Sequence, residues 1–357
     1  MYDLLSLYPT EIEELMASLG APKYRAKQVF AWLKSGTHPR DMTNLPKELR
    51  ERLGDAVRWS LPTVERKLIS AVDGTVKYLF RLHDGECIES VFMRYEHGNT
   101  LCISSQVGCR MGCRFCASTL TGRVRDLSAG ELLGQIIAAE CDTGERVSNV
   151  VMMGIGEPLD NYDNVLRFLH LVNHKDGLNI GYRHISLSTS GVVPRILSLA
   201  KEDLPITLSV SLHAASDEKR SAIMPINQKW NIKELLSACV AYYEATRRRI
   251  SFEYTLILGK NDGKEDARAL GELLNRYFKP IGAPVHVNLI RVNEVKETEM
   301  VRGSVASANA FAATLEHLGI TATVRRRLGA DIDAACGQLR AARMGKTEDK
   351  WNENTEK

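Results

Sequence analysis

The sequence lacks the features of a membrane or secreted protein. None of its 357 residues lie in a run that approaches 18 apolar positions, so we expect no transmembrane helix. The first ten residues have no basic region followed by an apolar core and a small-residue cleavage site. We therefore expect no secretory signal and a cytoplasmic protein. No internal repeat is present beyond an alternation of strand and helix patterns.

Cysteine is sparse and unevenly spread. Of eight cysteines, three fall within eight positions and the rest are scattered. In a cytosolic chain this pattern indicates metal-binding or catalytic thiols and argues against a disulfide framework. The net charge of +3 permits a nucleic-acid partner without arguing for one. The length suffices for one large α/β domain and a small extra one.

The first 66 residues read as a helical domain. A capping box at Thr10–Glu13 predicts a short helix that ends at Gly20, and further helices are predicted over Lys23–Leu33 and Leu45–Leu53. Basic residues are dense here. The simpler interpretation of these basic residues is a solvated helix surface, and the more specific one is a module that contacts RNA.

The remainder predicts a β-rich connecting segment over residues 67–99, a catalytic domain over 100–345 and a disordered polar tail over 346–357. In the catalytic domain, strand patterns alternate with helix patterns, which predicts an α/β fold with a parallel sheet, open or barrel-like. Chemistry in such a barrel takes place at the carboxyl ends of the strands. The expected strands are Leu101–Ser104, Val147–Met153, His184–Ser188, Ile206–His213, Ser251–Ile257, Val285–Ile290 and Thr321–Arg325.

The strongest motif is Cys109-x3-Cys113-x2-Cys116, directly after the first of these strands. Thiolates are the ligands that iron–sulfur clusters require, and three of them leave one iron of a [4Fe–4S] cluster open for a small molecule. We expect Arg110 and Arg114 to lower the thiol pKa values. The alternative is a zinc knuckle, but zinc usually takes four closed ligands and no fourth is nearby at the expected spacing.

The cysteine motif, with Phe115 before its last cysteine, resembles the signature of the radical S-adenosylmethionine (SAM) superfamily. That resemblance implies a partial (β/α)6 barrel, a [4Fe–4S] cluster on the three cysteines, and reductive cleavage of SAM to a 5′-deoxyadenosyl radical. Gly156 and Glu157 resemble the motif that binds the SAM amino group. Residues at later strand ends complete the predicted SAM site, namely Ser188, Ser211, Leu212, His213 and Asn293.

Further segments narrow the resemblance to the dual-specificity adenine-C2 methyltransferases of 23S ribosomal RNA and tRNA. The most specific is Asp331–Leu339. The family implies that Cys336 carries a methyl group taken from a first SAM, while a second SAM supplies the radical. Cys102 then resolves the covalent RNA adduct, leaving a Cys102–Cys336 disulfide, and Glu89 is the proton acceptor. Adenine C2 is not nucleophilic, which explains the need for radical addition and for a base and a thiol.

Several alternatives stay open at this point. C8-methylating enzymes of antibiotic resistance share the functional cysteines, and Arg291 stands where C2 enzymes usually have proline, although Pro158 favours C2. A radical SAM enzyme acting on a peptide or small molecule, and a non-enzymatic zinc-stabilised RNA-binding protein, are the other candidates.

The expected partners follow from the resemblance. They are 23S rRNA, tRNA and an electron donor such as flavodoxin or ferredoxin, with the protein itself a monomer. Basic runs at residues 247–249, 325–327 and 340–343 are candidate phosphate contacts. We also expect that deleting residues 1–66 abolishes RNA methylation but leaves cluster assembly intact.

Overall fold

The computed structural model describes residues 1–120, 122–292 and 300–332. A ten-stranded sheet with the strand order β14-β13-β12-β11-β10-β9-β6-β5-β4-β3 lies at its centre. The part from β6 to β14 is parallel throughout, which confirms the predicted α/β fold. Its strands are β6 (Thr100–Cys102), β9 (Asn149–Met152), β10 (Ile185–Thr189), β11 (Thr207–Ser211), β12 (Ile250–Leu256), β13 (Val285–Arg291) and β14 (Thr321–Val324).

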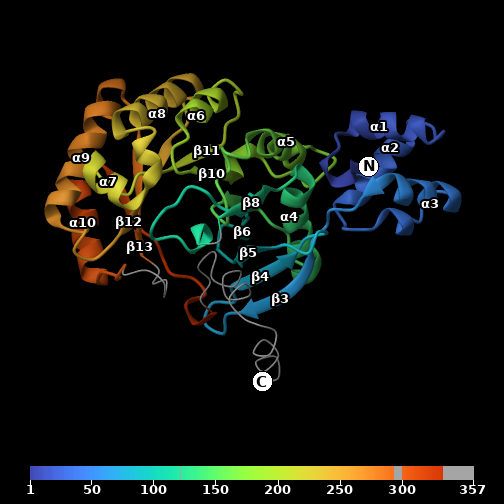
Figure 1. Cartoon of the computed structure of the whole chain (residues 1–357), viewed down its shortest axis with the longest axis horizontal. Coiled ribbons are helices and arrows are strands. Elements are labelled where there is room, and N and C mark those ends of the chain that lie inside the picture. Colours follow the sequence, from blue (N-terminus) through green and yellow to red (C-terminus); the bar gives the residue numbers. More distant parts are fainter. Residues whose placement is uncertain (121, 293–299, 333–357) are drawn as a thin grey trace.

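Helices between the parallel strands cover the outside of the curved sheet and make the partial barrel (Figure 1). They are α4 (Ala129–Thr143), α5 (Tyr162–Asn173), α6 (Val193–Leu199), α8 (Ile232–Thr246), α9 (Lys264–Phe278) and α10 (Val305–His317). The main hydrophobic core lies between these helices and the sheet. The short helix α7 (Asp217–Ile223) contributes instead to a second hydrophobic cluster, in which Ile223 packs with Cys113. In the described part of the chain, no helix is both long enough and apolar enough to cross a membrane.

Three antiparallel strands extend the sheet beyond β6. They are β3 (Thr63–Ile69), β4 (Val76–Arg81) and β5 (Cys87–Met93), and β5 pairs with β6 so that Val91 lies opposite Cys102. The β-rich segment predicted over residues 67–99 contains β4 and β5. It misses most of β3, because this edge strand is charged and largely exposed and therefore has no clear apolar alternation.

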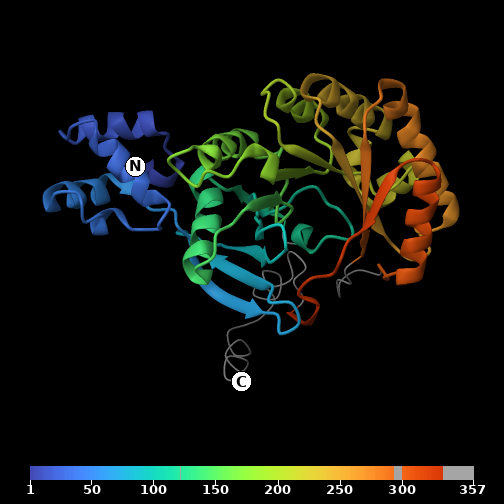
Figure 2. The same cartoon turned by 180° about the vertical axis from the view of Figure 1, so that it is seen from behind.

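The N-terminal helices form a separate lobe at one end of the molecule (Figures 1 and 2). They are α1 (Pro9–Ser18), α2 (Arg25–Leu33) and α3 (Lys47–Ala56), with the short parallel pair β1 (Tyr2–Asp3) and β2 (Val57–Arg58) beside them. The predicted cap at Thr10 is wrong. Pro9 begins the helix, and the Tyr8 amide donates to Glu11 Oε2 over 2.7 Å.

The first residues of the chain also hold the start of α4. A capping box begins this helix, since the Glu131 amide donates to Ser128 Oγ and the Ser128 amide donates to Glu131 Oε2. In addition, Ser128 Oγ donates to Asp3 Oδ2 over 2.6 Å, and the Gly130 amide donates to Ser6 Oγ over 2.7 Å. The N-terminal segment is thus bound by hydrogen bonds to the first turn of a barrel helix.

Candidate active site

A small hairpin supports the three-cysteine loop. Strands β7 (Gln106–Gly108) and β8 (Arg123–Asp126) pair antiparallel on either side of it, and the Cys109 amide donates to the Gly122 carbonyl over 3.0 Å. Gly108 has a φ of +77°, and a Cβ there would lie 1.8 Å from the Gly122 oxygen. Only glycine permits this crossing, so the loop is closed tightly at its base.

Burial dominates the chemistry of the loop thiols. It raises the pKa of Cys109 to about 12, and it also raises the pKa of Cys113. The predicted lowering of these pKa values by Arg110 and Arg114 is wrong, because burial has the larger effect on both thiols. Arg110 instead pairs with Asp160, and the cation that acts on Cys113 is Arg220. Metal binding at these thiols must therefore displace protons.

A cavity of about 210 Å³ opens where strands β9 to β13 end, at the carboxyl edge of the sheet. Its lining combines the cysteine loop with polar side chains of those strand ends. Five residues predicted from sequence meet the three cysteines there: Gly156, Glu157, Ser188, Ser211 and His213. Leu212 does not line the cavity, because its side chain is fully buried in the core.

Glu157 is a carboxylate withdrawn from water beside this cavity. Its Oε2 accepts a hydrogen bond from the Ser190 amide over 2.7 Å, and its Oε1 accepts one from the Leu159 amide over 3.1 Å. Burial nonetheless raises its pKa. An ammonium group in the cavity would offset the desolvation cost of the ionised form. Three thiols together with this carboxylate and the strand-end hydroxyls fit a cluster with SAM at its open iron.

Arg220 on α7 is a residue that the sequence did not single out. It is fully buried, and its guanidinium donates to the carbonyls of Ser190, Ser211 and Leu212 over 2.7–3.1 Å and to Asn227 Oδ1 over 2.9 Å. All four acceptors are neutral oxygens. Burial lowers the pKa of Arg220 to about 10, which leaves it charged at neutral pH. Arg220 therefore fixes the ends of β10 and β11 and places a positive charge beside the cysteine loop.

His213 lies on the same wall of the cavity in a fixed protonation state. Burial lowers its pKa to about 3, and its Nδ1 accepts the Thr255 amide over 2.9 Å. The ring is therefore neutral, with its proton on Nε2. Phe115 meets the ring edge to face at 4.8 Å. Two more lining residues, Glu253 and Arg325, were not predicted as cavity residues, although Arg325 belongs to a basic run expected to contact RNA.

Cys102 and Glu89 lie on one face of the sheet next to the cavity. Cys102 packs in a small buried cluster with Val91, Met153 and Leu328, and Met153 also lines the cavity. Glu89 precedes Val91 by two positions on β5 and shares its face. The carboxylate of Glu89 lies 3.3 Å from Lys77 Nζ, and both side chains are buried. Lys77 is a second residue that the sequence did not single out.

Several predicted residues lie outside the described part of the chain, namely Asn293, Cys336 and the basic run 340–343. Because Cys336 is among them, the described residues give no support to the predicted Cys102–Cys336 disulfide. Nor do they support the zinc knuckle. Within the described ranges, no group of three His, Cys, Asp or Glu side chains surrounds a point where one metal ion would sit, whereas a closed zinc site needs four.

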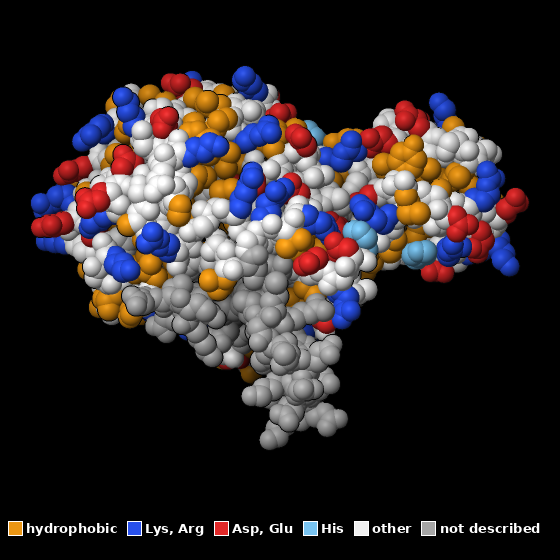
Figure 3. Space-filling view, in the orientation of Figure 1, with side chains coloured by type: hydrophobic (Ala, Val, Ile, Leu, Met, Phe, Trp, Pro, Cys, Tyr) orange, Lys and Arg blue, Asp and Glu red, His pale blue; other side chains and the backbone are white. Residues whose placement is uncertain are grey.

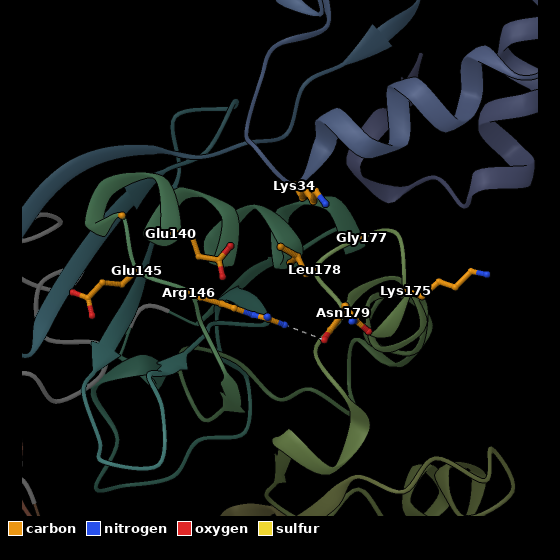
Figure 4. A pocket seen from close by; sticks show the side chains of 9 residues that line it. Lys34, Glu140, Glu145, Arg146, Lys175, Gly177, Leu178 and Asn179 are labelled. Carbon is orange, nitrogen blue, oxygen red and sulfur yellow. Dashed lines mark hydrogen bonds between the residues drawn. The ribbon is translucent and has the colours of Figure 1, made fainter.

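A second cavity, of about 480 Å³, lies at the other end of the barrel (Figure 4). Its lining includes Gly144–Arg146, which precede β9, and Gly177–Asn179, which precede β10. Its carboxylates already have partners, since Glu145 pairs with Arg94 and Glu140 accepts the Val147 amide. It has neither the thiols nor the strand-end hydroxyls of the first cavity, so we assign the chemistry to the cysteine site.

Two family models match the chain. The model described as "Radical SAM superfamily" matches residues 103–271, and the model described as "Ribosomal RNA large subunit methyltransferase N-terminal domain" matches residues 2–58. The first match covers the cysteine loop and most of the barrel. The second covers the N-terminal lobe, from β1 to β2.

Known proteins resemble the chain over nearly its whole length. A protein of Alkaliphilus oremlandii named "Probable dual-specificity RNA methyltransferase RlmN" is 53% identical, and the alignment covers 95% of this chain and 97% of that protein. A protein of the same name from Clostridium acetobutylicum is 50% identical over 98% of this chain and 100% of its own length. The crystal structure of a radical SAM methyltransferase from Sphaerobacter thermophilus matches with a TM-score of 0.90 at 42% identity, covering 96% and 100% of the two chains.

Proposed function

Because this chain belongs to the dual-specificity RNA methyltransferase family of the radical SAM superfamily, we propose that it methylates carbon 2 of adenosine in two RNAs. These are 23S rRNA, in the region of the peptidyl-transferase centre, and tRNA, at the adenosine 3′ of the anticodon. The observation that carries the proposal is the meeting of three thiols, Glu157 and strand-end hydroxyls in one cavity, with Cys102 and Glu89 on the adjoining face.

Cys109, Cys113 and Cys116 would hold the [4Fe–4S] cluster. When bound, cluster and SAM together supply the electron, the methyl group and the radical that the reaction needs. Glu157 accepts hydrogen bonds from the SAM ammonium, with Gly156 beside it. Ser188, Ser211 and His213, the Leu212 backbone and Asn293 bind the rest of the molecule. Arg220 positions the two strand ends that carry these hydroxyls.

The remaining steps fall to three residues. The Cys336 sulfur attacks the methyl carbon of SAM, forming an S–CH3 bond and releasing S-adenosylhomocysteine. One hydrogen atom of the S-methyl group passes to the SAM-derived radical, and the carbon joins adenine C2. Glu89 then accepts the proton that leaves C2, and the one electron left on the adduct would return to the cluster that supplied it. Cys102 then attacks the Cys336 sulfur, so that an S–S bond forms as the S–C bond to the product breaks and the product carbon takes up a proton. Glu89 and Cys102 are both buried on the same face of the sheet, which supports their action on the same adduct.

Mass spectrometry of nucleosides tests the proposal. Ribosomal RNA and tRNA are incubated with the anaerobically reconstituted protein, SAM and a reductant. We expect 2-methyladenosine, and we expect it to disappear with Cys336→Ala. A product of 8-methyladenosine would transfer the chain to the C8 class and make Arg291, the last residue of β13, the first suspect. Cleavage of SAM without any methylated adenosine would reject the RNA substrate, leaving a peptide or small molecule as the target.

The other partners are part of the same proposal. We expect flavodoxin or ferredoxin to donate the electron, a monomer to be the active form, and the reaction to take place in the cytoplasm where both RNAs reside. Metal analysis separates this proposal from the zinc-stabilised RNA-binding protein. Anaerobically prepared protein should contain iron and sulfide, whereas stoichiometric zinc without iron would favour the binding protein.

A further inference from the structure

The chain that follows β14 crosses the open side of the partial barrel. We call residues 325–332 the crossing segment. The Arg325 amide still donates to the Leu289 carbonyl of β13 over 2.9 Å, and the Arg325 side chain lines the cavity. Three residues later, Leu328 packs against the cluster formed by Val91, Met93 and Cys102. Figure 2 shows this stretch running from the last barrel strand to the tips of β3 and β4.

The crossing segment ends on the turn between β3 and β4, and the contact is reciprocal. Asp73 of the turn accepts the Gly329 amide at its Oδ2 over 2.8 Å. The Asp331 carboxylate of the crossing segment accepts a hydrogen bond from Ser70 Oγ over 2.7 Å and another from the Ala71 amide over 2.9 Å. Each side thus supplies one carboxylate to backbone donors of the other, across more than 250 residues of sequence.

Electrostatics and burial favour a persistent contact. Partial burial raises the pKa of Asp73, but hydrogen bonds from the Gly329 and Thr75 amides outweigh it and bring that pKa to about 2. The carboxylate is therefore ionised at neutral pH and accepts charge-assisted hydrogen bonds. Gly329 is buried, and its φ of +59° is a left-handed conformation that glycine adopts readily. Its amide, withdrawn from water, needs the Asp73 oxygen as acceptor.

We propose that the turn Ser70–Thr75 is the docking site that positions the chain leading to Cys336. Ser70, Asp73 and Asp331 are then positioning residues for its thiol. The inference rests on the proposed function of Cys336 as methyl carrier. Only four peptide steps separate Ile332 from Cys336, and each spans at most about 3.6 Å. Anchoring Asp331 therefore limits the volume that the thiol samples and raises its effective concentration at the SAM site.

The test uses the full chain with its cluster and compares wild type with Ser70→Ala and with the double variant Asp73→Asn/Asp331→Asn. The control is Val72→Ser, at the same turn, where the side chain is 77% exposed and makes none of these contacts. Four quantities are measured: iron content, SAM cleavage, the S-methyl occupancy of Cys336 in protein isolated from cells, and RNA methylation.

We expect unchanged iron and SAM cleavage in all variants. RNA methylation should fall about tenfold in the double variant and about threefold in Ser70→Ala, with S-methyl occupancy falling in the same order, because the double variant removes the charge from both carboxylate acceptors whereas Ser70→Ala removes one donor to Asp331. The ratio of 5′-deoxyadenosine formed to adenosine methylated should rise, and a merely structural role would not move this ratio. Val72→Ser should match wild type.

Two results would overturn the proposal. One is wild-type S-methyl occupancy and coupling ratio in both variants. The other is rapid hydrogen exchange of the Ala71 and Gly329 amides in the wild-type protein, a measurement that does not require the variants to fold. If the wild type itself carries no S-methyl group on Cys336 and methylates no RNA, the proposed function has failed, and the amide exchange still decides whether the contact exists.

Discussion

Lys77 and Glu89 form an ion pair that water does not reach. Their charged atoms lie 3.3 Å apart on neighbouring strands, and neither side chain is more than 1% exposed. Removing one partner of such a pair leaves a charge buried without its counterion, which costs about 3–5 kcal/mol. We therefore expect Lys77→Met to lower the free energy of unfolding by about 3 kcal/mol, as measured by urea denaturation at pH 7.

The double variant supplies the control for that prediction. Lys77→Met with Glu89→Gln removes both charges and should recover at least half of the lost stability, since the two residues are energetically coupled. Simple additivity of the two single effects would contradict the coupling. The folded Glu89→Gln protein should also retain SAM cleavage, because Glu89 lies on β5, outside the lining of the cysteine cavity.

Arg220 is the second residue whose role follows from burial. Replacing it with methionine removes the donor of the Ser190 and Ser211 carbonyls, whereas the Leu212 carbonyl still accepts the Ala214 amide, and we expect a cost of about 3 kcal/mol. Arg220→Lys keeps the charge but lacks the planar guanidinium with its several N–H donors, and it should recover only part of the lost stability. Both variants should bind SAM more weakly, as measured by calorimetry on the reconstituted protein. Arg268→Met on α9, where the side chain is exposed, is the control and should match wild type in both measurements.

At the scale of elements, the β7–β8 hairpin decides whether the cysteine loop can close. A Cβ at Gly108 would lie 1.8 Å from the Gly122 oxygen, so Gly108→Ala must open the hairpin. We expect this variant to lose most of its iron and sulfide after anaerobic reconstitution. Gly85→Ala is a matched control, because Gly85 has a similar φ of +85° but nothing within 4 Å of the added carbon. Equal iron loss in the two variants would mean that backbone strain, and not the clash, is responsible.

The parallel strands were predictable because short strand patterns alternate regularly with helix patterns along this part of the chain. The predicted starts and ends of β10, β12, β13 and β14 lie within one residue of those in the structure. The cysteine loop and the strand-end residues also follow from motif and order along the chain, because the carboxyl ends of parallel strands meet at one edge. Motif and strand order therefore predicted the cavity as a meeting point of Cys109, Glu157, Ser188 and Ser211.

Tertiary contacts determine what the sequence could not predict. Arg220 belongs to Asp217–Arg220, a charged run that in isolation indicates a solvated helix, yet the fold buries it completely. Lys77 sits in an alternating strand whose polar face is expected in water, and the sheet is covered on that face. The reciprocal contacts of Asp73 and Asp331 join positions more than 250 residues apart, which no local pattern reveals.

At the scale of the whole molecule, the N-terminal lobe and the barrel are not independent. Asp3 and Ser6 accept hydrogen bonds at the start of α4, and Leu4 and Leu5 belong to the main core. Strand β3 begins at Thr63, so deletion of residues 1–66 would also uncover β4. Loss of RNA methylation after that deletion would therefore not separate RNA contact from damage to the barrel. Exposed charges of the lobe are the better target.

Figure 3 shows Lys and Arg side chains scattered over both lobes on one face, with acidic side chains among them, so the described residues of this face form no single basic patch. Lys23, Lys27 and Lys47 are exposed on the N-terminal lobe. If this lobe contacts RNA, changing all three to glutamine should weaken tRNA binding, because phosphate contacts are lost. Each lost contact should also make the decline of log affinity with log salt less steep by about 0.7–0.9. Iron content and SAM cleavage should not change.

The matched control removes the same charge elsewhere. Lys264, Arg276 and Lys279 are exposed on and just after α9, which lies at the opposite end of the molecule from α1–α3 (Figure 1). Binding is measured by fluorescence anisotropy with tRNA between 50 and 200 mM salt, a range over which a few phosphate contacts change affinity by orders of magnitude. A lowered slope only in the N-terminal variant would assign the lobe to the RNA backbone. Equal slopes in the two triple variants would mean that the lobe's lysines act through net charge alone, and RNA contact would then have to come from the barrel, where Arg325 already lines the cavity.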